Sequence, residues 1–240
     1  MMRFGQPYFR RLHRFLNVDS AFEPPLRLRD IVDPPILQFG PPRTGSTLVW
    51  NTLREIFPSR RVEKRHKLSW FRLSLLSRSE IVCTVRHPLD TVALSLQRYD
   101  LPPSTEAIQR QLAQLDHRMQ CALRVKNHPR ALILKYERFA DDFEFLFESL
   151  EKFFAIVVDQ EVRARVRDKY SIDRVKKVAD SLGDFSNWDP TTHIHGRHIS
   201  RYHGRAGYYR EFFSGDQIDL LRRRCASFIE AFDYKVDDSV

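Results

Sequence analysis

The sequence has 240 residues, a length that fits one α/β domain with a proper core and does not require a second domain. Forty lysines and arginines against 31 aspartates and glutamates give a formal net charge of +9, which favours phosphate-bearing or polyanionic partners. The arginines do not gather on one face that could contact nucleic acid, so nucleic acid is not expected as a partner. No segment has the apolar length of a transmembrane helix.

Three cysteines, Cys83, Cys121 and Cys225, stand far apart in the chain, and no two of them have the spacing of metal ligands. This pattern indicates reduced thiols, as in a cytosolic protein. Residues 1–34 are basic, and charges interrupt their apolar positions too often for a signal peptide. We therefore expect a cytoplasmic protein in which residues 1–34 form a basic arm or short helix packed on a domain of residues 35–240.

Residues 36–50 predict a strand, a phosphate-binding loop and a helix, because an apolar run breaks at Gly40 and a helical pattern starts near Ser46. Gly40 and Gly45 fit the frame Gly-x-x-x-x-Gly-Lys-Ser/Thr, with Ser46 in the place of the lysine. Inward-pointing loop amides and the helix N-terminus suit an anion, and Arg43 could replace the missing lysine. The residues expected at the anion are Arg43, Thr44, Gly45, Ser46 and Thr47. A plain strand-to-helix turn is the alternative interpretation.

The rest of the chain alternates between strand and helix patterns. In chain order we expect a helix to about residue 57, a short polar strand at 61–67, a buried strand at 80–86 with a helix to 99, a helix at 105–125, a strand at 131–136, a helix at 143–154, a charged helix at 160–182, a long loop at 183–204 and a final helix after 214. This alternation predicts a single-domain α/β fold of the P-loop nucleotide-binding type, with a mostly parallel sheet flanked by helices on both faces.

Two further basic sites fall near strand ends or turns. Arg86 ends the strand at 80–86 and Ser95 lies on the next helix, which places a guanidinium and a hydroxyl near a second phosphate position; an ion pair with Asp90 is the alternative role of Arg86. Arg205 and Gly207 belong to a basic glycine turn that could close over a bound anion, although such turns are common on surfaces.

Four segments, in chain order, resemble the motifs of sulfotransferases that use 3′-phosphoadenosine 5′-phosphosulfate (PAPS) as donor. Residues 42–47 resemble the 5′-phosphosulfate loop, 85–90 the 3′-phosphate motif, 132–137 the third-strand signature and 207–214 the C-terminal motif. The resemblance implies transfer of a sulfuryl group from PAPS, without a metal, to the hydroxyl or amine of an acceptor. A glycan, a lipid, a small alcohol or a peptide would suit as acceptor, and the oligomeric state is open.

The resemblance also assigns catalytic residues. Residues 63–66 match the segment in which the family holds its base, which implies that His66 is the general base, with Glu63 as a carboxylate alternative. Lys64, on the same side of a strand as His66, and Arg43 would stabilise the transferring group. The sequence departs from the family at Leu94, where a serine is usual.

Other departures concern the nucleotide. Leu48 replaces the tryptophan that often stacks on adenine, and the C-terminal Arg-Lys-Gly is represented only by residues 202–204, so either Arg201 or Arg205 could reach the donor.

Two other function classes stay open. A P-loop NTPase or nucleotide kinase needs the Walker lysine and an acidic residue for magnesium, whereas this chain has Ser46 and Arg86 at the corresponding places. A non-catalytic basic module that binds polyanions would instead need its arginines on one exposed face. The long loop adds a group of histidines whose role is open, because no carboxylate or cysteine completes a metal-ligand set: His193, His195 and His198.

Overall fold

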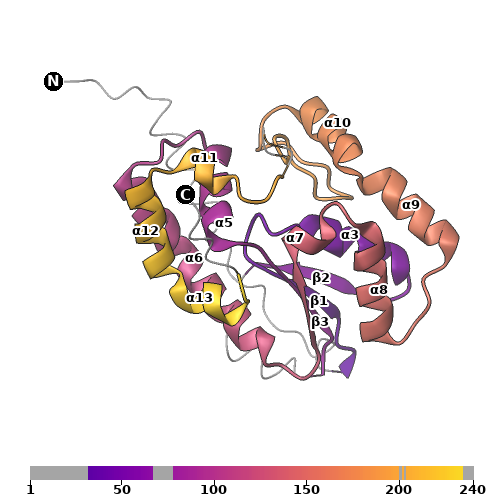
Figure 1. Ribbon diagram of the computed structural model, residues 1–240. Helices are drawn as coiled ribbons and strands as arrows, with labels where there is room; N and C mark the ends of the chain where they lie inside the picture. Colours follow the sequence, from indigo (N-terminus) through magenta and orange to yellow (C-terminus); the bar gives the residue numbers. More distant parts are fainter. Residues whose placement is uncertain (1–31, 67–77, 200–201, 203, 235–240) are drawn as a thin grey trace.

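The computed structural model describes residues 32–66, 78–199, 202 and 204–234 (Figure 1). The basic arm expected over residues 1–34 lies outside the described residues except for its last three. Within the described parts of the chain, no helix is long and apolar enough to cross a membrane.

The centre of the fold is a sheet of four parallel strands in the order β2-β1-β3-β4. β1 (Ile36–Phe39) and β3 (Ile81–Val85) are buried along their whole length, as their apolar sequences predict. β2 (Val62–Arg65) and β4 (Ala131–Lys135) flank them and are only partly buried for most of their length. This parallel sheet confirms the predicted α/β fold class.

Helices cover both faces of the sheet (Figure 1). One face packs on α5 (Pro88–Arg98), α6 (Thr105–Lys126), α12 (Gly215–Arg224) and α13 (Ala226–Ala231) through a large apolar core. The other face packs on α3 (Ser46–Ile56), the short α7 (Tyr136–Phe139) and α8 (Phe143–Phe154). Apolar residues at helical spacing supply these contacts and give the helices their positions.

In the second half of the chain, two helices that the sequence pattern predicts as continuous are each split into shorter helices. The charged helix expected over residues 160–182 is two helices, α9 (Gln160–Tyr170) and α10 (Ile172–Leu182), because Ser171 takes an extended conformation between them. The final helix likewise divides at Cys225, and the short α11 (Tyr209–Phe212) precedes it. α9, α10 and the loop that follows share a third apolar cluster with α8, which holds this region against the domain.

The carboxyl ends of three strands meet at one edge of the sheet. Gly40 follows β1, His66 follows β2 and Arg86 follows β3. Open α/β sheets bind ligands at this edge, because the loops that leave the strands leave a crevice between them. The fold therefore brings together segments that are up to 46 residues apart in the sequence.

Candidate active site

A cavity of about 360 Å³ opens at this edge. It is lined by the phosphate loop, the ends of β2 and β3, one side of α5, the start of α7, and residues of the segment 185–199 together with Gly204. Cavities of about 300–1,000 Å³ are typical of small-ligand sites. Among the described residues, no aspartate or glutamate lines it, and its charged side chains are Arg43, Lys64, Arg86 and Arg98.

The phosphate loop turns sharply before α3. Both Arg43 (φ 68°) and Gly45 (φ 75°) adopt the left-handed region, and a Cβ added to Gly45 would lie 2.8 Å from the Phe139 ring. Glycine is therefore required at position 45 for the loop to pass this close to α7. The Thr44 hydroxyl donates to the Pro41 carbonyl at 2.7 Å, so this side chain braces the loop.

The Arg43 side chain is half-buried at the cavity. It donates from Nη1 to the His198 carbonyl at 3.0 Å, while its Nε has no hydrogen-bond partner among the described residues. Burial first, and then the positive charge of Arg86, lowers the pKa of Arg43 to about 10. A bound anion would pair the Nε–H group and relieve the repulsion between the two guanidiniums, so the site fits an anionic ligand.

Arg86 is held rigidly at the same cavity, with 2% of its side chain exposed. Its Nη2 donates to the carbonyls of Gly204 and Arg205, both at 2.8 Å, and lies 3.6 Å from the Asp90 carboxylate. The guanidinium also lies over the Tyr136 ring, 4.0 Å from its centroid. Arg86 thus has the ion pair considered from the sequence and also lines the cavity.

The structure does not bring Ser95 to the cavity. Ser95 is buried on α5, and its hydroxyl donates to the Thr91 carbonyl at 2.7 Å within the helix. Leu94, one residue earlier and about 100° round the helix, lines the cavity in its place.

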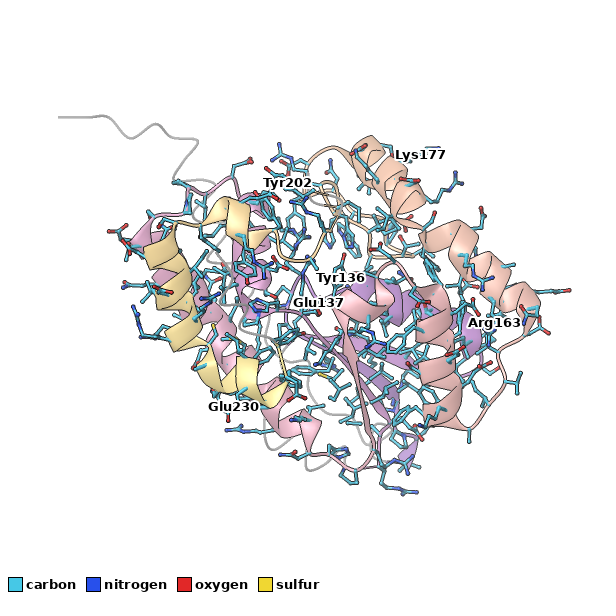
Figure 2. The ribbon with its side chains drawn as sticks, viewed as in Figure 1. Tyr136, Glu137, Arg163, Lys177, Tyr202 and Glu230 are labelled. Carbon is cyan, nitrogen blue, oxygen red and sulfur yellow. The ribbon has the colours of Figure 1, made fainter. Side chains whose placement is uncertain are left out.

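The basic glycine turn approaches the site through its backbone. The Arg205 side chain is exposed and pairs with Glu211, and only its carbonyl contacts Arg86. The Gly207 amide donates to Asp90 at 2.7 Å. Gly204 lines the cavity, where a Cβ would lie 2.2 Å from the Tyr136 hydroxyl. Figure 2 shows Tyr136 and Glu137 near the middle of the molecule, with Tyr202 above them in this view.

Lys64 and His66 both line the cavity from the end of β2. The Lys64 ammonium donates to the Thr47 hydroxyl at 2.8 Å, and burial, followed by the charge of Arg98, lowers the pKa of Lys64 to about 8. His66 Nδ1 lies 2.7 Å from the Gly40 carbonyl, which can only accept, so Nδ1 carries the proton. In the neutral ring Nε2 then has the lone pair that a general base requires.

Glu63, the carboxylate alternative to His66, forms ion pairs with Arg61 and Arg65 and does not line the cavity.

The loop at 183–199 crosses over α3 and supplies residues that the sequence did not assign. Trp188 and His195 form an antiparallel bridge within it, and the His195 Nδ1 lies 3.1 Å from the Phe185 carbonyl. Burial lowers the pKa of His195 to about 4, which keeps this ring neutral. His195 and His198 line the cavity, whereas His193 lies against Trp50. Within the described ranges, no three histidine, cysteine or acidic side chains are grouped as metal ligands.

The sequence analysis missed five further cavity residues as site residues: Arg98, Tyr99, Tyr136, Phe185 and Ile199. Of these residues, only Tyr136 could have been recognised from the sequence, because it lies in the segment that resembles the third-strand signature. The Arg98 guanidinium stacks on Phe185, 3.5 Å from the ring centroid, a contact between α5 and a loop more than 80 residues away.

A smaller apolar pocket of about 80 Å³ adjoins the cavity. The two share Gly45, Thr47 and Tyr136, and the pocket continues to Leu48 and to α10 at Val175. A cationic cavity next to an apolar pocket is an arrangement that suits a nucleotide, with its anionic groups in the first and its base in the second.

Comparison with known proteins places the chain by its fold. No protein-family model matches the sequence, and no curated protein matches it. The structure of mouse sulfotransferase SULT7A1 complexed with PAP is similar, with a TM-score of 0.59, 17% identity, and coverage of 83% of this chain and 87% of that one. Retinol dehydratase in complex with androsterone and the inactive cofactor PAP is also similar, with a TM-score of 0.58, 15% identity, and coverage of 97% and 88%. The expected sulfotransferase fold is thus confirmed.

Proposed function

We propose that this protein transfers a sulfuryl group from PAPS to a hydroxyl or amine of an acceptor. The observation that carries the proposal is the set of side chains around one cavity: Arg43, Lys64 and Arg86 supply positive charge, and His66 supplies an imidazole oriented by a backbone carbonyl. The two similar structures, both of which contain PAP, support the same donor.

The two anionic ends of the donor would be bound at different parts of the cavity. The phosphate loop, with Arg43 and the N-terminus of α3, suits the 5′-phosphosulfate, because loop amides and the helix end favour negative charge. Arg86, fixed by Asp90 and two carbonyls, suits the 3′-phosphate. The apolar pocket beside Tyr136 and Leu48 would take the adenine ring.

The transfer is an in-line displacement at sulfur, in which the acceptor oxygen bonds to sulfur as the bond to the donor phosphate breaks. Negative charge then grows on the bridging and equatorial oxygens, and Arg43 and Lys64 lie where they can stabilise it. Nε2 of His66 accepts the proton that the acceptor hydroxyl loses. The acceptor is a glycan, a lipid, a small alcohol or a peptide under this proposal.

A nucleotide kinase fits the cavity less well. Ser46 stands in the place of the Walker lysine, and the cavity has no carboxylate among its described lining residues to hold magnesium. A non-catalytic polyanion-binding module would not require an oriented imidazole beside the phosphate loop.

Calorimetric titration of the protein with nucleotides tests the proposal. PAP (3′-phosphoadenosine 5′-phosphate) should bind far more tightly than ADP, and magnesium should not change its affinity. Equal affinities for the two nucleotides, or a requirement for magnesium, would support the kinase. Salt-sensitive binding of polyanions without any PAP binding would support the non-catalytic module. Labelled PAPS and a panel of acceptor classes would then measure transfer itself.

A further inference from the structure

A second cavity, of about 480 Å³, lies at the far end of α3. The end of α3, the junction of α9 and α10, and the loop at 189–194 form its walls. Four cationic side chains and two acidic ones line it: Arg54, Arg60, Lys169, Arg174, Glu55 and Asp189.

The two carboxylates are already engaged by neighbouring groups. Glu55 pairs with Arg165 and Lys169 and accepts from the Tyr170 hydroxyl. Asp189 accepts the backbone N–H groups of Thr191 and Thr192, which fixes the turn of the loop.

Two of the arginines have no carboxylate partner in the described parts of the chain. The Arg54 guanidinium donates to the Thr191 carbonyl and lies over the Trp50 ring. Arg174 is exposed on α10 and forms no ion pair with a described residue. The cavity therefore keeps positive charge that its own acidic residues do not compensate, which favours an anionic group.

One indole ring separates this cavity from the candidate active site. The Trp50 centroid lies 4.5 Å from the Arg54 guanidinium, which lines the second cavity, and 5.9 Å from the Lys64 ammonium, which lines the first. The His193 ring lies against the same indole at 4.4 Å. A ligand of a few sugar or peptide units that passes over this indole would be long enough to contact both cavities.

An exposed aromatic side chain stands beside this partition. Trp188 is 47% exposed, and its ring lies 5.2 Å from His193 and 6.0 Å from His195, which lines the first cavity. Contact between an exposed indole and the apolar C–H face of a sugar ring stabilises the complex, because both apolar surfaces are removed from water. This feature favours a saccharide over a peptide as the spanning ligand.

We propose that the second cavity binds an anionic group of an acidic oligosaccharide, whose reacting hydroxyl lies in the first cavity. Arg54 and Arg174 contact the anion, and Trp188 stacks on an intervening sugar ring. The proposal rests on the proposed sulfuryl transfer, which it deepens by naming the acceptor class.

Calorimetry on the full chain, with and without saturating PAP, tests it. The probes are a tetrasaccharide of alternating glucuronic acid and N-acetylglucosamine, the neutral tetramer of N-acetylglucosamine, and tetraglutamate. The acidic tetrasaccharide should bind at least about tenfold more tightly than the neutral one, and Arg54→Gln/Arg174→Gln should remove that preference, since each lost charge-assisted contact costs about tenfold or more.

A matched variant controls for net charge. Arg110→Gln/Arg223→Gln removes the same two charges from exposed positions on α6 and α12, on the other face of the sheet, and should keep the preference within about twofold. Trp188→Ala should weaken binding of the acidic tetrasaccharide but not of tetraglutamate.

Equal losses in the two double variants, or no loss in Arg54→Gln/Arg174→Gln, would overturn the anion site. Tighter binding of tetraglutamate than of the acidic tetrasaccharide would overturn the saccharide assignment. Absence of PAP binding to the wild type would instead contradict the proposed function, and the titrations without PAP would still report on the second cavity.

Discussion

The Arg86 guanidinium and the Asp90 carboxylate lie 3.6 Å apart at the start of α5, with 2% and 0% of their side chains exposed. Asp90 also accepts the backbone N–H groups of Gly207 and Tyr209, at 2.7 and 3.0 Å. The pair therefore joins the end of β3 to the segment before α11. A single buried carboxylate both holds the candidate 3′-phosphate arginine and closes one wall of the cavity.

Asp90→Ala should lower the free energy of unfolding by about 3–5 kcal/mol, because it leaves a buried guanidinium uncompensated and two N–H groups without an acceptor. Urea denaturation measures the loss. Asp180→Ala is the control, since Asp180 pairs with Lys176 at the same spacing on the exposed side of α10 and should cost no more than about 0.5 kcal/mol. Similar small losses in both variants would contradict the structural role of Asp90.

Arg86→Ala should weaken binding of PAP by about 10- to 100-fold and binding of AMP, which lacks the 3′-phosphate, far less, because one charge-assisted contact is lost. Calorimetry with the two nucleotides gives the ratio. Arg130→Ala removes a positive charge at the other end of the parallel strands, where Arg130 pairs with Glu80, and should leave the ratio unchanged. Equal weakening of PAP and AMP would make Arg86 a structural residue.

Ser95→Ala should change PAP affinity by less than about twofold, because the Ser95 hydroxyl donates within α5 and does not line the cavity. Leu94→Ser should instead raise affinity for PAP relative to AMP, since it adds a hydroxyl where α5 faces the cavity beside Arg86. The same two-nucleotide titration checks both variants. A clear loss of PAP affinity in Ser95→Ala would restore the phosphate contact expected from the sequence.

His66→Asn should lower turnover by about 10²- to 10⁴-fold, because the amide can keep the hydrogen bond to the Gly40 carbonyl but cannot accept a proton as Nε2 does. PAP affinity and the melting temperature should stay close to those of the wild type. The fall in rate at acid pH, which protonation of the base causes, should vanish in this variant. Near-normal turnover in the folded variant would remove His66 from the mechanism.

PAP affinity should fall about tenfold per pH unit above pH 8, because burial lowers the pKa of Lys64 to about 8 and the free protein then loses a cation from its cavity. Lys64→Arg should delay this fall, since a guanidinium stays charged to about pH 12, and Lys64→Gln should bind weakly without the step. Titrations from pH 7 to pH 9.5 measure the profiles. An unchanged profile in Lys64→Arg would contradict the assignment.

The same pKa has a consequence for stability. Lys64 in the unfolded chain titrates near pH 10, as a free lysine does at about 10.4, so between about pH 8 and pH 10 the unfolded state binds more protons than the native state. The contribution of Lys64 to the free energy of unfolding therefore rises with pH across this window. Urea denaturation of the wild type and of Lys64→Gln at several pH values isolates that contribution. The free energy of unfolding of the wild type should rise relative to that of the variant from about pH 8 to pH 10, and a fall would contradict the lowered pKa.

Local sequence determined the elements that meet at the active edge. The apolar run that ends at Gly40, the glycine at 45 and the helical pattern from Ser46 define a strand, a tight turn and a helix, because each depends on neighbouring residues and backbone freedom alone. The buried strand that ends before Arg86 could be recognised for the same reason. Together with the strand-and-helix alternation of the rest of the chain, these segments predicted the fold class. The family resemblance also needed residues 132–137 and 207–214 in the right order.

Tertiary packing decided which side chains reach the cavity. The pattern of α5 could not tell Leu94 from Ser95, because the face that a helix turns to the cavity is set by the helices packed on its other sides. The turn at 204–207 approaches with its carbonyls instead of the Arg205 side chain, since Asp90 and Arg86 bind its backbone. The loop with His195 crosses α3 through contacts far apart in the sequence, and such long-range contacts leave no local pattern to read.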